Sequence, residues 1–255
     1  MSTASATPFP RNVPEHYKER VDLACAFRWT ERFDFHESVA NHFSLAVNDD
    51  GSQFLINANL MHFRRIKASN LLLLDANDPE TLDRPDAPDA TAWGLHAPLH
   101  RNVPHARCAI HVHSTYATVL ASLQDSTLPP IDQNTAMFFE RYVIDNEFGG
   151  LAFESEGERC ASMFEDPKKK IMIMGNHGLL VIGETVAEAF HLMYYFERAA
   201  ENYIKAKWTG EPLRVMSDEL ARKVAGEIES YAPFSRHHFG ELKAILDEED
   251  PSFRD

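Results

Sequence analysis

The feature that most constrains this chain is a short apolar run that ends in two histidines. Residues Cys108 to His113 read CAIHVH, and Ser114 follows as a residue suited to begin a helix. An apolar run bounded in this way predicts a buried strand that leads directly into a helix. Side chains two residues apart on a strand lie on the same face, so His111 and His113 are expected to point to the same side. The run therefore predicts two nitrogen ligands at the end of a strand.

A third histidine stands in a similar position farther along the chain. The turn Asn176-His177-Gly178 lies between two strand-like runs, 170–174 and 179–182. An HxH pattern alone is more often structural than functional, but a third imidazole from another strand end can close one side of a divalent metal ion. The sequence therefore predicts a metal site at His111, His113 and His177 that keeps positions open for a ligand.

The remaining periodicity predicts the fold class. A hairpin is expected around the Asn48–Gly51 turn, and Thr185 with Glu188 forms a capping-box pattern at the start of a long helix. Pro98 is expected to kink or shorten the helix in which it lies. Strands alternate with helices but the hairpin is present too, so we expect a mixed sheet with helices on both faces, a three-layer α/β/α fold. The expected strands are 42–47, 53–57, 71–74, 108–113, 170–174 and 179–182. The first expected helix begins near Pro14, and the later ones cover about 91–102, 114–123, 185–206, 217–231 and 235–247.

Composition limits the setting in which the protein works. With 255 residues and 44% hydrophobic content, the chain has material for one large core. We expect a flexible arm at residues 1–12, one domain over 13–212, and helices at 213–255 that pack on this domain or on a neighbouring subunit. A net charge of -14 argues against nucleic acid and anionic membranes as partners. The absence of a leader pattern, of a long apolar stretch and of a CxxC pair predicts a cytoplasmic protein.

With these elements in order, the chain resembles the class II aldolase/adducin family. The resemblance covers roughly residues 18–206 and rests on His96 in the helix before the HxH and on the segments AIHVHSTYATVLA, LPPIDQNTA and GNHGLLVIGETVAEAFHLMYYFERAAE. It implies a layered α/β/α domain, often a tetramer with its sites between subunits. It also implies that His111, His113 and His177 ligate zinc or a similar divalent ion. Imidazole also accepts Mn, Fe, Co and Ni, so the sequence leaves the metal open.

Two departures from the sugar-phosphate aldolases of this family bear on the substrate. The position where those enzymes place a glutamate before the HxH is Ala92 here. Their phosphate-binding segments are rich in small residues that let backbone N–H groups approach a phosphate, whereas the matching segments here are Asn57–Leu60 and Asp89–Thr91. A carboxylate beside a phosphate repels it. The sequence therefore argues against a sugar phosphate and against a base at position 92.

The chemistry that remains is carbon–carbon cleavage of a small anionic metabolite. Three neutral imidazoles leave the charge of the ion uncompensated, which favours a hydroxy or oxo carboxylic acid as ligand. Decarboxylation needs the developing enolate to be stabilised, and it suffers less from the missing glutamate than aldol cleavage does. We expect His42, Asn59, His96, Arg64 and Arg65 near the substrate, with the two arginines able to clamp a carboxylate. The alternatives are ordinary strand or packing roles for the histidines and simple surface charges for the arginines.

Two further hypotheses stay open. The first is a non-catalytic oligomeric module, as in the adducin branch of the family, which also lacks the glutamate. The second is an active aldolase in which another carboxylate replaces the missing base, either Glu140 from the FFERY segment, expected as a helix, or a residue of a neighbouring subunit. Whichever of these hypotheses holds, the chain is expected to form a homo-oligomer, with a tetramer favoured.

Overall fold

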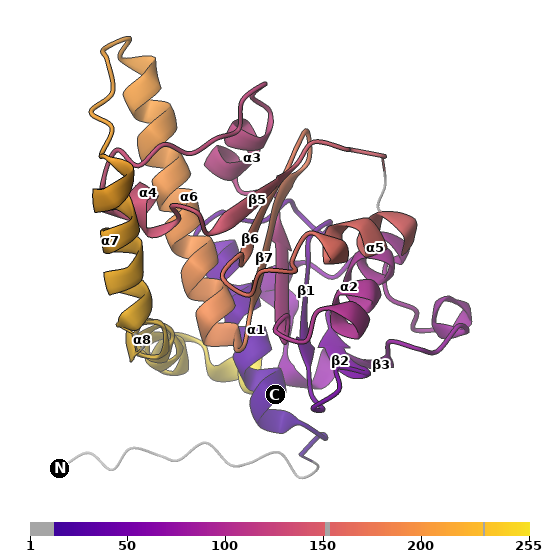
Figure 1. The fold of residues 1–255 in the computed structure, drawn as a ribbon. Helices are drawn as coiled ribbons and strands as arrows, with labels where there is room; N and C mark the ends of the chain where they lie inside the picture. The colour runs from indigo at the N-terminus through magenta and orange to yellow at the C-terminus, as the bar shows by residue number, and fades with distance from the viewer. Residues whose placement is uncertain (1–12, 151–153, 232) are drawn as a thin grey trace, which may run out of the picture.

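A seven-stranded sheet forms the centre of the molecule (Figure 1). The computed structural model describes residues 13–150, 154–231 and 233–255, so the arm predicted at 1–12 lies outside the described residues. Across the sheet the order is β3-β2-β1-β4-β7-β6-β5, and every neighbouring pair is antiparallel except β5 and β6, which are parallel. The predicted mixed sheet is confirmed. The strands are β1 His42–Ala46, β2 Gln53–Ile56, β3 Leu72–Asp75, β4 Cys108–Val112, β5 Tyr142–Asp145, β6 Ile171–Met174 and β7 Gly178–Gly183.

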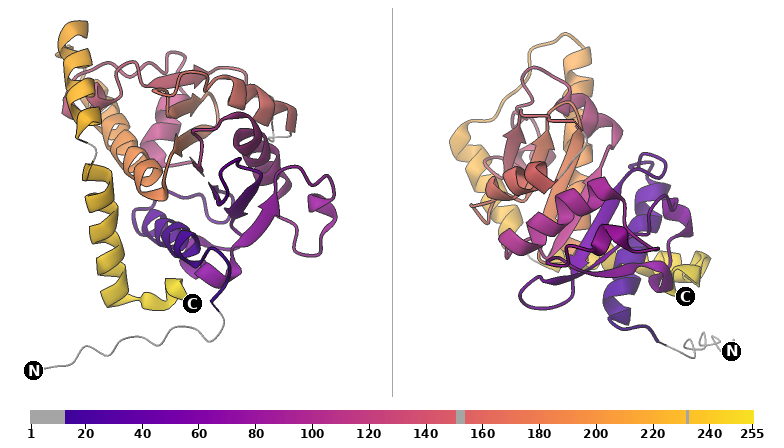
Figure 2. Two further views of the ribbon diagram at one scale, coloured as in Figure 1. Left: turned by 60° about the horizontal axis from the view of Figure 1, so that its bottom comes forward. Right: turned by 90° about the vertical axis from the view of Figure 1, so that its right-hand side faces the viewer.

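Helices cover both faces of this sheet, which gives the predicted three layers. One face packs on α1, α3 and α6, with α8 packed on α6 and α1, and the other face packs on α2 and α5 (Figures 1 and 2). None of the helices in the described ranges is long and apolar enough to cross a bilayer. The helices are α1 Tyr17–Arg32, α2 Ala90–Asn102, α3 Thr115–Ala121, α4 Gln133–Met137, α5 Glu154–Ser162, α6 Val186–Trp208, α7 Asp218–Ser230 and α8 Pro233–Glu249.

Strand alternation places apolar and polar side chains on opposite faces of the central strands. In β1, Phe43 and Leu45 join the core beneath α1 and α6, whereas Ser44 turns to the layer of α2. In β4, Ile110 joins the same core beneath α1 and α6, and His111 lies on the other face of the sheet. The face beneath α2 therefore carries the polar groups that this fold buries.

The helix that contains Pro98 does not end there, so the expectation that Pro98 shortens it is wrong. Pro98 has no N–H to donate to the carbonyl of Gly94, one turn earlier. Gly157 of α5 packs directly on that carbonyl, because a Cβ added to Gly157 would lie 1.9 Å from the Gly94 oxygen. The neighbouring helix therefore occupies the place of the missing donor, and α2 continues to Asn102.

The C-terminal helices pack on the same chain. One face of α6 is apolar and buried, and α8 packs on α6 through Phe239, Leu242 and Leu246. The buried side chains of α6 include Ala189, Met193, Phe196, Ala200 and Tyr203. The indole of Trp29 in α1 donates to the carbonyl of Leu242 at 2.8 Å. Figure 2 shows α8 passing α1 towards the C-terminus. The final turn, Pro251–Arg254, is joined to α1 by the pair Arg28–Asp250 at 2.9 Å.

The sequence reasoning missed the elements between α3 and β6. The segment contains α4, the edge strand β5 and α5, each with at most nine residues. Their apolar periodicity covers only one or two turns, which is too short for a pattern to separate a helix from a strand. The FFERY segment was expected as a helix, but its first residues form a turn after α4, in which Glu140 has φ 59°, and its last residue, Tyr142, begins β5.

Candidate metal centre

Three histidines meet where β4 ends and the hairpin of β6 and β7 turns. His111 is the fourth residue of β4 and His113 follows the strand, while His177 lies in the turn between β6 and β7. Because β7 pairs with β4, this turn is brought beside the HxH. The turn is tight, since Asn176 adopts the left-handed conformation with φ 58°. The fold therefore unites the three predicted ligands.

The residue after His177 allows this close approach. A Cβ added to Gly178 would lie 2.7 Å from the carbonyl oxygen of Val112 and 2.7 Å from Cδ2 of His113. Any larger side chain would push the turn away from β4 or displace the imidazole. The glycine of the NHG pattern is thus required by the packing of this turn against the candidate ligand His113.

The ring nitrogens are spaced as ligands of one ion. One nitrogen from each of the three histidines lies within 4.8 Å of the other two, and the Nε2 atoms of His111 and His113 are 3.1 Å apart. Two imidazole nitrogens bound at about 2.05 Å to a tetrahedral zinc ion would lie ~3.3 Å apart. Nδ1 of His177 is buried without a hydrogen-bond partner among the described residues. The donor set therefore fits a divalent metal ion.

The surroundings keep these imidazoles neutral and oriented. Nδ1 of His111 donates to the carbonyl of Leu179 at 3.1 Å, which leaves the lone pair on Nε2. Burial lowers the pKa of His111 well below its usual value, and it also lowers the pKa of His113. Burial, followed by the neighbouring His113, lowers the pKa of His177 to about 4. At neutral pH each of the three rings is therefore neutral and keeps a lone pair on one nitrogen for a metal ion.

A carboxylate that the sequence reasoning missed lies beside the cluster. Oε2 of Glu37 is 3.9 Å from Nδ1 of His113, and the Glu37 side chain is exposed. The buried Asn41 holds its loop in place, because Oδ1 of Asn41 accepts from the backbone N–H groups of Glu37 at 2.6 Å and His113 at 3.4 Å. Glu37 has no motif that would have distinguished it from other exposed acids in the sequence.

The family follows from the fold and from the histidine cluster together. A model of the Class II Aldolase and Adducin N-terminal domain matches residues 21–204. The chain belongs to this family. The resemblance found in the sequence is therefore confirmed, and class II aldolases are also the structural neighbours of the fold.

Similar proteins extend over nearly the whole chain. A protein of Pseudomonas aeruginosa that is named as an aldolase class 2 protein is 26% identical, over 93% of this chain and 92% of its own length. Decarboxylase NovR of Streptomyces niveus is 25% identical over 82% of this chain and 76% of its own. The crystal structure of an aldolase II superfamily protein from Pseudomonas syringae has a TM-score of 0.84 and 28% identity, over 96% of this chain and 98% of its own.

Ala92, which the sequence resemblance matches to the glutamate of the sugar-phosphate aldolases, makes apolar contacts with its side chain. Ala92 is buried in a cluster with Phe54, Ile56 and Trp93. The residue that begins α2 is Asp89, whose carboxylate accepts from the backbone N–H groups of Thr91 and Ala92 and so caps the helix. In the first turn of α2, Ala92 therefore packs in the apolar cluster and Asp89 caps the helix. Neither residue brings a carboxylate to the three histidines.

The residues predicted near the substrate divide into two groups. His42 and His96 are buried at the cluster, since the rings of His42 and His111 lie 4.9 Å apart and Nδ1 of His42 is 2.8 Å from Nε2 of His96. Asn59, Arg64 and Arg65 are exposed between β2 and β3. In the described residues neither arginine has an ion-pair partner, so both are available to an anion from solvent.

The carboxylate of Glu140 is engaged elsewhere. It pairs with Arg222 of α7 at 2.9 Å. Glu140 precedes β5 at the end where Tyr142 pairs with Ile171, whereas His177 follows the opposite end, where Asp145 pairs with Met174. Within one subunit, Glu140 is therefore at the wrong end of the sheet to replace the missing base.

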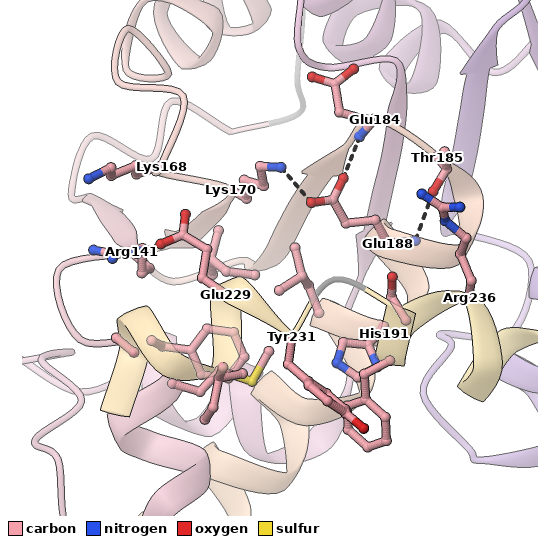
Figure 3. Close-up of a pocket in the computed structure, with 18 residues that line it drawn as sticks. Arg141, Lys168, Lys170, Glu184, Thr185, Glu188, His191, Glu229, Tyr231 and Arg236 are labelled. Carbon is pink, nitrogen blue, oxygen red and sulfur yellow. Dashed lines mark hydrogen bonds and ion pairs between the residues drawn. The ribbon is translucent and has the colours of Figure 1, made fainter. Parts of the chain in front are cut away.

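A cavity of about 310 Å³ lies away from these histidines, between the start of α6 and the junction of α7 and α8 (Figure 3). Its charged residues include two ion pairs, Lys170–Glu188 at 2.5 Å and Arg141–Glu229 at 3.0 Å. Figure 3 shows the Lys170 amine turned towards Glu188 across this cavity. None of the three candidate ligands lines it, so the cavity is separate from the candidate metal centre.

Proposed function

We propose that this chain is a divalent-metal-dependent carbon–carbon lyase, a decarboxylase or an aldolase, that acts on a small hydroxy or oxo carboxylic acid. One observation carries the proposal: three neutral histidine nitrogens converge within 4.8 Å at the end of β4. His111, His113 and His177 would hold the ion, for which we favour zinc, with Mn, Fe, Co and Ni as alternatives. When bound, the ion would supply an electrophile that stabilises negative charge on a ligand oxygen.

The surrounding residues support an acid rather than a sugar phosphate. The segment between β2 and β3 offers exposed Asn59, Arg64 and Arg65, and a planar guanidinium fits a carboxylate in a bidentate manner. His42 and Glu37 are two groups beside the cluster that can hold or move a proton. The similarity to a protein named a decarboxylase agrees with this assignment. We therefore propose that His42, Asn59, Arg64, Arg65 and His96 form the substrate side of the site.

Metal content and turnover together test the proposal. The purified chain, loaded in turn with each of the five metals, is assayed for release of CO2 or of an aldehyde from a panel of 2-hydroxy, 2-oxo and ortho-hydroxy aromatic acids. We expect about one metal ion per chain and turnover that is lost after chelation and in His113→Ala. Arg64→Ala and Arg65→Ala should raise KM. Unchanged substrate affinity in both variants would contradict the proposal that these arginines bind the substrate carboxylate. A metal-free chain without turnover would instead favour the non-catalytic, adducin-like module.

We also propose that the protein works in the cytoplasm as a homo-oligomer, with a tetramer favoured. Several large apolar side chains are exposed between the end of α6 and the start of α7, among them Trp208, Val215 and Leu220. Apolar side chains of this size are commonly covered in an assembly. Light scattering after gel filtration measures the mass directly, and a 29.0 kDa particle would contradict this part of the proposal.

A further inference from the structure

A line of buried polar groups runs away from the candidate metal centre between the sheet and α2. Nδ1 of His42 is 2.8 Å from Nε2 of His96, and Nδ1 of His96 is 2.5 Å from Oγ of Ser44. The same oxygen is 2.7 Å from Nε2 of His100. All four residues are at most 4% exposed. His42 and Ser44 come from one face of β1, and His96 and His100 come from one face of α2.

Packing alone does not account for this line. The neighbouring positions of the same layer are filled by Leu95, Leu99 and Phe54, and burying a polar group among them costs free energy unless it is hydrogen-bonded. Here the three bonds occupy Nδ1 of His42, both ring nitrogens of His96, Oγ of Ser44 and Nε2 of His100. At the far end of the line, Nδ1 of His100 is buried without a partner among the described residues. Burial also lowers the pKa of His100 to about 3, so the ring is neutral. The chain of bonds is therefore built from groups that both donate and accept.

Such a chain has two arrangements of its protons. In the first, Nδ1–H of His42 donates to His96, Nδ1–H of His96 donates to Ser44, and the hydroxyl of Ser44 donates to Nε2 of His100. In the second, every bond is reversed, and the outermost proton lies on Nε2 of His42 instead of Nδ1 of His100. Both arrangements keep each imidazole neutral.

The two ends of the line lie in different places. At one end, the ring of His42 packs against the ligand His111, and these two residues are paired across β1 and β4. At the other end, His100 lines a cavity of about 240 Å³ with Asp50 and Arg107, beyond the opposite end of β1. The line thus joins the candidate centre to a second cavity at the opposite end of β1.

We propose that His42, His96, Ser44 and His100 form a proton path that serves the candidate metal centre. This inference rests on the proposed lyase function, in which a carbanion left by bond cleavage must be protonated. The proton on Nε2 of His42 goes to the product carbon. The protons of His96, Ser44 and His100 each move one bond towards His42, and Nδ1 of His100 takes one proton from the second cavity. No imidazole becomes charged, and the path supplies the acid that Ala92 cannot.

Nitrogen NMR of the full chain, labelled with ¹⁵N-histidine and free of metal, tests the path without any substrate. We expect the ring nitrogens of His42, His96 and His100 to show shifts averaged between the two tautomers. Ser44→Ala should fix each ring in one tautomer, and Ser44→Thr, which keeps the hydroxyl, should restore the averaging. His100→Gln provides a second interruption should Ser44→Ala fail to fold. The rings of His191 and His238 are the internal control.

Fixed tautomers in the unmodified protein, or averaging that survives both interruptions, would overturn the path. Failure of the proposed function can be distinguished from failure of the proton path. It would appear as a lack of bound metal or of turnover, while the exchange between tautomers persists. Once a substrate is found, Ser44→Ala is expected to lower kcat by about 100-fold, the smaller end of the range for a lost proton donor. KM and the zinc content should stay within about two-fold, whereas a variant that merely disturbs the site would lose zinc as well.

Discussion

The hydroxyl of Ser114 donates to the buried carboxylate of Glu197 at 2.6 Å and so joins the end of the HxH segment to the middle of α6. The same carboxylate accepts from the backbone N–H groups of Tyr116 at 2.7 Å and Ala117 at 2.9 Å. Ser114 was predicted to cap α3 with its own side chain, but the structure shows that Glu197 provides the cap. A carboxylate at a helix N-terminus is favourable, because the free N–H groups point towards it.

Removal of that carboxylate should therefore loosen the strand end that carries two candidate ligands. Glu197→Ala leaves three donors without an acceptor, and we expect a loss of about 2–4 kcal/mol in the free energy of unfolding, since a bond to a charged group contributes about 1.5–3 kcal/mol. Urea unfolding of the variant and the unmodified chain measures this loss in the free energy of unfolding. Glu201→Gln, on the next turn of α6, removes only ion pairs near the surface and should cost less than about 0.5 kcal/mol. Equal losses in the two variants would contradict the assigned role of Glu197.

The sequence predicted the parts of the site that follow from local spacing. His111 and His113 share a face because they are two residues apart on a strand, and the NHG turn was identified from the strands around it. The same reasoning places His42 and Ser44 on one face, and His96 and His100 one helical turn apart. Local spacing does not predict that the face of β1 and the face of α2 meet, because their contact depends on how α2 packs across the sheet.

Other features could not be predicted for physical reasons. The effect of Pro98 depends on Gly157, a residue of another helix that occupies the free carbonyl of Gly94. Glu37 lies in a loop, and only the long-range pairing of β1 with β4 brings it to His113. The edge strand β5 is four residues long and half-buried, so it carries neither the alternation nor the length that identifies a strand.

Metal binding should stabilise the folded chain. A ligand at one hundred times its dissociation constant adds about 2.7 kcal/mol, which corresponds to a rise in Tm of about 5–10 °C for a chain of this size. We expect this shift when zinc is added to metal-free protein, followed by differential scanning calorimetry. His113→Ala should abolish the shift, and His237→Ala, an exposed residue of α8, should retain it. A shift that persists in His113→Ala would place the metal elsewhere.

The pair His191 and His238 should make stability depend on pH. Their Nδ1 atoms are 3.2 Å apart between α6 and α8, and His191 lies beside the cavity of Figure 3. Burial, followed by the neighbouring His238, lowers the pKa of His191 to about 4 from an ordinary value of 6.5. Below pH 6.5 the unfolded chain takes up this proton and the folded chain does not, so stability falls as the pH falls from 6.5 to 4.

Replacement of the ring should remove this contribution. Relative to His191→Phe, the unmodified chain should lose up to about 1 kcal/mol more of its unfolding free energy per pH unit in that window. Urea titrations at pH 6.5, 5.5 and 4.5 provide the comparison. His237→Phe replaces the adjacent exposed histidine and should follow the unmodified chain. Parallel curves for the unmodified chain and His191→Phe would refute the assignment.

The close approach of the NHG turn to β4 gives the last prediction. Gly178→Ala places a Cβ 2.7 Å from both the Val112 carbonyl oxygen and Cδ2 of His113, so either the turn or the ligand must move. We expect a loss of about 1–3 kcal/mol, typical of overpacking, and zinc affinity lower by at least about 10-fold, as for other changes that misorient a ligand. Gly240→Ala in α8 meets no atom within 4 Å and should stabilise by about 0.5–1 kcal/mol. Calorimetric zinc titration of both variants tests this prediction, and unchanged affinity in Gly178→Ala would contradict the idea that the packing of Gly178 fixes the position of the candidate ligand His113.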